Sequence, residues 1–364
     1  MKKFACVPGL YQYLGMRAMF QFFGKEFAEF PEITEAMLKY GEGKSPEYAC
    51  LPFKIYLGFF RELAQAGVND VLIHGTRNIR ACRYLDLWAG IQKYLREEGY
   101  KDFTFHFWGG YGAKYSFRQL RKIMGGPSYL KMARGILVYT STLQATDELN
   151  DLANYARPRA YDFATVDNWL KKSLDALKPV RSRRQLSPLL AAAKADFAQI
   201  KLDRSRPISR LALVGDLFKV HEPFFHFDTI RKLNRLGVEV KQPQSFSLLF
   251  IGSNRLPSRA GYSRQFKEYQ QKSKKYLRSL PASYLDLGVG EAVAEVAGGA
   301  RGIVHFQSFG CMPDIMLKPI LDRIGRDYKV PVLHFMRDTH ASDAAYQTRL
   351  EAFVDLIKRQ ELKK

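Results

Sequence analysis

The sequence has few cysteines, and none of them forms a metal-binding pair of the usual kind. Its 364 residues include four cysteines, and no Cys-x-x-Cys pair is present. This excludes zinc ribbons and ferredoxin-type clusters held by one short segment. Four cysteines are also too few for a disulfide scaffold of this length, so we expect them to stay reduced. The four are Cys6, Cys50, Cys82 and Cys311.

Long hydrophobic runs and familiar catalytic motifs are also missing. No apolar run approaches the roughly 20 residues that span a bilayer, and charged residues interrupt the apolar patches near the N-terminus, so we expect neither a membrane anchor nor an export signal. A cytoplasmic protein is therefore predicted. The glycine-rich stretches at 109–112 and 288–291 do not form a dinucleotide or ATP loop, and neither GxSxG nor HExxH occurs.

Positive charge, by contrast, is in large excess. There are 57 Lys and Arg against 36 Asp and Glu, a formal charge of +21, and the excess is concentrated at 178–185, 201–207 and 255–278. Such a field attracts polyanions, among them nucleic acid, a phosphorylated cofactor or an acidic protein. No RNA-recognition or zinc-finger signature accompanies it, which disfavours nucleic acid as a partner.

Hydrophobic periodicity predicts an α/β protein with two doubly wound parallel-sheet lobes and a helical insertion between them. Apolar strands alternate with amphipathic helices near both ends of the chain, and this alternation is typical of parallel sheets with crossover helices. From about Ser116 to Ile200 the strand pattern stops. The expected units are an N-terminal α/β lobe (1–115), a helical bridge (116–206) and a C-terminal α/β lobe (207–364).

Three of the cysteines are expected near helix starts. Cys50 lies in the first turns of a helix predicted from Pro46 to Ala66 with Ser45 as its N-cap, whereas Cys82 and Cys311 each follow a predicted strand. Ligands of parallel sheets bind beyond the carboxyl ends of the strands. A helix N-terminus also lowers a cysteine pKa and favours the thiolate that binds metal. The alternative is that they are small buried apolar side chains, which is the expectation for Cys6 in its apolar strand. His305 and His334 are expected to be core histidines with satisfied hydrogen bonds and not catalysts.

Several motifs together resemble one protein family. The segments "SPEYACLPFKIYLGFFRELAQAGVNDVLIHG", "CRY", "LVGDLFKVHEPF", "FGCMPDIM" and "VPVLHFMRDTHASDAAYQTRLEAFVDLI" occur in order. They resemble the activase-related branch of the 2-hydroxyacyl-CoA dehydratase superfamily, over most of 1–115 and 207–358. Related sequences tend to have Pro where Ser308 stands and Glu where Thr339 stands.

The resemblance implies a cofactor and its ligands. In that superfamily three cysteines, one per motif, hold a [4Fe–4S] cluster between two lobes, and one iron is left without a protein thiolate. The matching residues are Cys50, Cys82 and Cys311. A separate ATP-dependent activator supplies the electron, which passes to an acyl-CoA thioester. The resemblance thus implies a lyase or a reductase component, either as a homodimer or as a heterodimer, and Arg80 and Arg83 beside Cys82 could tune the cluster.

Two other interpretations stay open at this point. One is a non-enzymatic basic α/β protein that binds nucleic acid or another polyanion, with steeply salt-dependent affinity and no iron. The other is an assembly subunit whose cysteines are only structural. The identity of the acyl-CoA and the type of cluster do not follow from the sequence.

Overall fold

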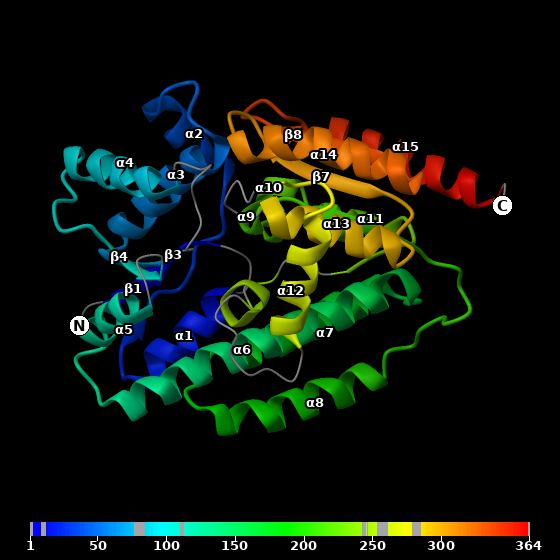
Figure 1. Cartoon of the computed structure of the whole chain (residues 1–364). Helices are drawn as coiled ribbons and strands as arrows, with labels where there is room; N and C mark the ends of the chain where they lie inside the picture. The colour runs from blue at the N-terminus through cyan, green and yellow to red at the C-terminus, as the bar shows by residue number, and fades with distance from the viewer. Residues whose placement is uncertain are drawn as a thin grey trace.

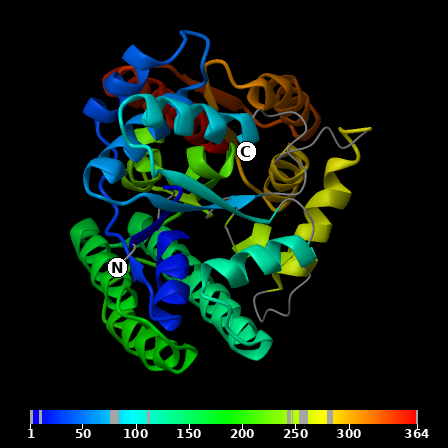
Figure 2. The same ribbon diagram turned by 90° about the vertical axis from the view of Figure 1, so that its left-hand side faces the viewer.

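The computed structural model confirms the predicted fold class. It describes residues 3–8, 12–75, 84–109, 113–241, 245, 247–252, 261–278 and 285–362. Within them the chain forms two four-stranded sheets, all parallel, with helices packed around them. Figures 1 and 2 show the long helices α6, α7 and α8 together on one side of the molecule, opposite α14 and α15.

The N-terminal sheet has the strand order β2-β1-β3-β4. Its central strand β3 is apolar on both faces, as expected for a parallel sheet covered on both sides: Val71 and Ile73 contact one hydrophobic core and Leu72 another. The strands are β1 (Lys3–Cys6), β2 (Glu26–Phe27), β3 (Asp70–Gly75) and β4 (Thr104–Gly109).

The helix predicted from Pro46 to Ala66 was placed wrongly at its start. Ser45 ends the preceding helix α2, because its hydroxyl donates to the carbonyl of Gly41 at 2.6 Å. α3 begins only after Cys50, which is its N-cap residue. The helices of this lobe are α1 (Gln12–Phe22), α2 (Glu35–Lys44), α3 (Leu51–Gln65) and α4 (Tyr84–Glu97).

Two glycines allow α2 and α3 to pack with their backbones in contact. A Cβ atom at Gly41 would lie 1.9 Å from the carbonyl oxygen of Lys54, and one at Gly58 would lie 2.1 Å from that of Met37. No side chain fits at either place. The pair therefore fixes the position of α3, and with it the position of Cys50.

The helical region has its own hydrophobic core and also supports the N-terminal lobe. Leu14 and Ala18 of α1 pack into this core beside α6. Arg159 forms an ion pair with Glu239 of β6 at 2.6 Å, which ties the region to the second sheet. Its elements are α5 (Ala113–Ile123), α6 (Tyr129–Ala156), η1 (Arg157–Arg159), α7 (Phe163–Leu177), η2 (Arg183–Gln185) and α8 (Leu186–Ala198).

The C-terminal sheet repeats the strand order of the first, as β6-β5-β7-β8. All six residues of β7 are buried. The strands are β5 (Ser209–Val214), β6 (Val238–Val240), β7 (Ile303–Ser308) and β8 (Val332–Arg337). The helices are α9 (Leu217–His221), α10 (Pro223–His226), α11 (Thr229–Arg235), η3 (Leu248–Gly252), α12 (Tyr262–Ser273), α13 (Leu285–Ala297), α14 (Met312–Tyr328) and α15 (Asp343–Leu362).

The two lobes share one continuous hydrophobic core. It includes residues of both sheets, and the ring of Tyr56 on α3 contacts that of Phe218 on α9 with centroids 4.8 Å apart. Such a junction holds the two sheets in a fixed relation. In the part of the chain that the structure describes, no helix combines the length and the apolar character needed to cross a membrane.

Candidate cysteine site between the two sheets

Cys311 lies at the turn between β7 and α14. It is the N-cap residue of α14, with extended backbone angles (φ −89°, ψ 108°), Pro313 in the first turn and no capping hydrogen bond from its side chain. Gly310, which precedes it, has a φ of 74°, a conformation that favours glycine. The thiol is thus presented beyond the carboxyl end of a central strand.

Cys50 occupies the equivalent position at the start of α3. It is also an N-cap residue in extended conformation (φ −64°, ψ 150°), it is followed by Pro52, and its side chain makes no capping hydrogen bond. The pattern Cys-x-Pro thus begins one helix in each lobe. Neither side chain makes a regular capping hydrogen bond, although the first-turn N–H groups of Phe53 and Asp314 lower the pKa values of Cys50 and Cys311.

The fold brings these two helix starts together. A Cβ atom at Gly310 would lie 3.2 Å from the carbonyl oxygen of Tyr48 and 3.6 Å from the Cα of Cys50. The turn before α14 therefore touches the turn before α3, and Figure 1 shows α14 starting beside the N-terminal lobe. Glycine is needed at 310 for its backbone conformation as well as for this close approach.

A fully buried lysine connects the cysteine site to two carboxylates. The Nζ atom of Lys219 on α9 lies 3.3 Å from the Sγ atom of Cys311 and 2.6 Å from Asp216, and it forms a second ion pair with Asp314. The Lys219 side chain is 0% exposed. Asp314 in turn accepts a hydrogen bond of 2.8 Å from the backbone N–H of Ser308. One ammonium and two carboxylates leave a formal charge of −1 beside the thiols.

Burial favours the neutral form of both thiols. Burial raises the pKa of Cys311 to about 12, with Lys219 acting against it, and burial also raises the pKa of Cys50. The expectation that the helix N-termini would favour thiolates was therefore wrong for the metal-free chain. Loss of hydration outweighs the helix dipole, and Asp216 and Asp314 oppose a further negative charge.

Of the other two cysteines, Cys82 is an expected ligand and Cys6 an expected core residue. Cys82, with Arg80 and Arg83 beside it, lies outside the described residues. Cys6 is buried in β1, where burial raises its pKa further still, and it belongs to the hydrophobic core. Among the described residues, no group of three or more Cys, His, Asp or Glu side chains has the arrangement of a metal site. The structure thus juxtaposes two of the three expected ligands.

The sequence interpretation missed three residues of this site, Lys219, Asp216 and Asp314. A signal was present, because Asp216 and Lys219 follow the apolar strand β5 and Asp314 follows β7, all at carboxyl ends. Polar residues at those ends gather at one edge of a parallel sheet. Their convergence on one ammonium depends on the turn geometry, which the sequence does not reveal.

His305 and His334 form a pair inside the C-terminal lobe. Their Nδ1 atoms lie 2.9 Å apart, and Nε2 of His334 lies 2.8 Å from Asp322. His334 is thus satisfied as expected. Nε2 of His305 has no hydrogen-bond partner among the described residues, so the expectation holds for only one of the two rings.

No protein-family model and no curated protein matches this sequence. The candidate site thus rests on the residues and their geometry.

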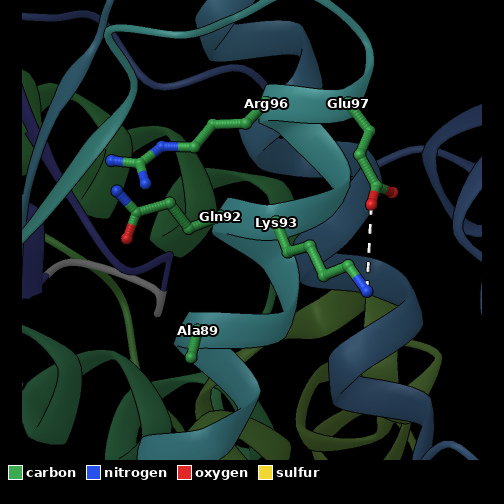
Figure 3. Close-up of a pocket in the computed structure, with 5 residues that line it drawn as sticks. All are labelled: Ala89, Gln92, Lys93, Arg96 and Glu97. Carbon is green, nitrogen blue, oxygen red and sulfur yellow. Dashed lines mark ion pairs between the residues drawn. The ribbon is translucent and has the colours of Figure 1, made fainter.

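Two concavities are lined by neither Cys50 nor Cys311. One follows the outer face of α4 and is lined by residues of that helix alone, with Lys93 and Glu97 paired at 3.8 Å (Figure 3). The other, of about 490 Å³, lies at the amino ends of β1, β3 and β4, beside the pair formed by Asp70 and His106 at 2.7 Å. Neither contains a cysteine, and the second is at the opposite edge of its sheet.

Proposed function

We propose that this chain is an iron–sulfur protein of the 2-hydroxyacyl-CoA dehydratase type, with Cys50, Cys82 and Cys311 as ligands of a [4Fe–4S] cluster. The observation that carries the proposal is the meeting of Cys50 and Cys311, one from each lobe, at two helix starts. The sequence resemblance picks out the same two cysteines together with Cys82.

The chemistry of the donor set fits such a group. Thiols are the ligands that iron–sulfur clusters use, and the ammonium of Lys219 beside Cys311 offsets part of the negative charge that thiolate ligands bring. Because both thiols are protonated in the metal-free chain, loading must release their protons. The burial that raises their pKa values also excludes water, which protects a low-potential centre.

When bound, such a cluster supplies one-electron transfer at low potential. The residues of this chain would hold it between the lobes. Next to Cys311 the first turns of α14 form an apolar rim, with Ile315 65% and Met312 50% exposed. This rim supports the proposal that an acyl-CoA thioester and a separate ATP-dependent activator reach the site.

The test is anaerobic purification with iron and sulfide analysis and a visible spectrum. We expect roughly four irons per chain and a broad charge-transfer band in the wild type, both lost in Cys311→Ala and Cys50→Ala. Cys6→Ala is the matched control, because it removes a thiol from the core of β1, and it should keep the cluster. A wild type that stays colourless after anaerobic reconstitution contradicts the proposal.

A second candidate function is binding of a polyanion through the helical region. Arg181, Arg183 and Arg184 are exposed, and none of the three has an acidic partner among the residues that the structure describes. We expect Gln at all three positions to weaken retention of a DNA oligonucleotide and to flatten its salt dependence. Unchanged retention and salt dependence would reject this surface.

A further inference from the structure

The ammonium of Lys219 contacts at least three acceptors in the interior of the protein. Its side chain is 0% exposed, and its partners are Asp216, Asp314 and the Sγ atom of Cys311 at 3.3 Å. An ammonium group has three N–H bonds. With two carboxylates and one sulfur around it, its donors are directed toward fixed positions.

These partners come from two turns at the carboxyl edge of the second sheet. Asp216 is the N-cap of α9 and accepts from the backbone N–H of Phe218 at 2.9 Å, so it is fixed by the turn after β5. Asp314 is in the first turn of α14 and accepts from the N–H of Ser308, so it is fixed by the turn after β7. Lys219 therefore joins the two turns, and Cys311 sits at that junction.

We propose that Lys219 is the positioning residue of Cys311, and that its N–H···S hydrogen bond sets the reduction potential of the cluster held there. The inference rests on the proposed function and adds a residue that the sequence resemblance did not assign. Hydrogen bonds to coordinating sulfur stabilise the reduced, more negative form of a cluster and so raise its potential.

A lysine with a purely structural role would not require a hydrogen bond to the sulfur of Cys311. An ammonium on any side of the pair would offset the charges of Asp216 and Asp314 equally well, yet Lys219 also reaches the thiol of Cys311 at the helix start. It acts on Cys50 as well, since its charge lowers the pKa of that thiol against the effect of burial. One cation thus faces candidate ligands from both lobes.

The experiment separates the hydrogen bond from the charge. Lys219→Met combined with Asp314→Asn removes one positive and one negative charge, so the formal charge beside the thiols stays at −1, as in the wild type. The Asn oxygen can still accept from Ser308. Lys219→Arg keeps both the charge and a donor. Lys241→Met, which removes an exposed lysine paired with Glu295 at 3.2 Å, is the distant control.

Anaerobic potentiometric titration of the purified holoproteins gives the main readout. We expect a lower potential in the double variant, a higher potential in Asp314→Asn alone, and values near the wild type in Lys219→Arg and Lys241→Met. Resonance Raman spectra give a second signature, because an Fe–S stretch that shifts in D₂O reports an exchangeable N–H···S bond. That shift should disappear in the double variant.

The outcomes distinguish this inference from the proposed function. A wild type without iron overturns both. A wild type with a cluster, together with a double variant of unchanged potential and an unchanged D₂O shift, overturns the role of Lys219 alone. Circular dichroism checks that the double variant is folded; a folded variant that loses iron supports the role. Should it not fold, Lys219→Gln replaces it, and a potential equal to that of the wild type would then overturn the role.

Discussion

The two sheets share one strand order, but the helices that begin after Cys50 and Cys311 are connected to different strands of it. α3 leads into the third strand of the N-terminal sheet, whereas α14 follows the third strand of the C-terminal sheet. A crossover helix runs antiparallel to the strands, so both helices begin at the carboxyl edge of their sheet. Two different connections therefore bring a cysteine to the same edge.

The lobes also differ in what surrounds the thiol. Cys311 has Asp314 on its own helix and Lys219 from the neighbouring turn of the same lobe. The charged groups that shift the pKa of Cys50 are these same residues and Asp216, all from the C-terminal lobe. The N-terminal lobe thus contributes a thiol and the C-terminal lobe contributes both a thiol and the charges. The site is complete only when the lobes are packed together.

The largest expected effect concerns the reactivity of Cys311. In iron-free protein carrying Ala at the other three cysteines, alkylation at pH 8 should be roughly a thousandfold slower than that of a thiol with the ordinary pKa of 9.0, because burial raises this pKa to about 12. The rate should rise about tenfold per pH unit up to pH 11. A plateau below pH 9 would show that Lys219 outweighs burial.

The next effect tests how the N-terminal lobe fixes Cys50. Gly41→Ala should lower the free energy of unfolding by about 3 kcal/mol or more, because its Cβ would meet the Lys54 carbonyl at 1.9 Å and force α2 away from α3. Gly43→Ala, in the same helix with nothing within 4 Å of its Cβ, should stabilise by up to about 1 kcal/mol. Urea unfolding measures both, and equal values would refute the close-packing argument.

A third effect depends on pH and involves both lobes. Glu222, in the C-terminal lobe, has its pKa raised to about 7, first by burial and then by the carboxylate of Glu32 from the N-terminal lobe. The folded state therefore binds this proton more tightly than the unfolded state, whose pKa is near 4.5. Its contribution to stability is present below about pH 4.5 and is lost as the pH rises to 7.

Replacing this carboxyl should remove that pH dependence. At pH 8 the free energy of unfolding of Glu222→Gln should be higher than that of the wild type by roughly 2 kcal/mol. Between pH 4.5 and 7 this free energy should change less with pH in the variant than in the wild type. Thermal unfolding at several pH values gives the slope. Glu32→Gln should also raise the free energy of unfolding at pH 8, but by less. A free energy of unfolding that changes more steeply with pH in either variant than in the wild type would contradict this account.

The smallest effect concerns the ion pair between the lobes. Arg337, the last residue of β8, is buried over the rings of Phe224 and Phe227, its pKa is lowered by burial to about 10, and it reaches Glu35 of α2 at 3.5 Å. The Glu35 side chain is 61% exposed, so Glu35→Gln should cost no more than about 0.5 kcal/mol. A larger loss in chemical unfolding would make this pair a principal lobe contact.

Much of the architecture was predictable because it depends on short-range patterns. The runs around Val71 and Val304 are apolar on both faces, as in a parallel sheet that is covered on both sides. The strand pattern stops near Ser116, and this end of the pattern predicted the helical region. The start of α3 was not predictable in the same way. Ser45 followed by proline is typical of a helix start, but tertiary packing of Gly41 against Lys54 made Ser45 the end of α2.

The sequence by itself determined that Cys311 begins a helix, because a buried strand followed by Cys-x-Pro favours a helix start there. It placed Cys50 inside a helix instead of at its start. Only the tertiary structure decided that the two helix starts touch and that Lys219 lies between two carboxylates and a thiol. Those contacts join residues from different turns and different lobes. Their distances are set by how the two sheets pack, a quantity that no local pattern encodes.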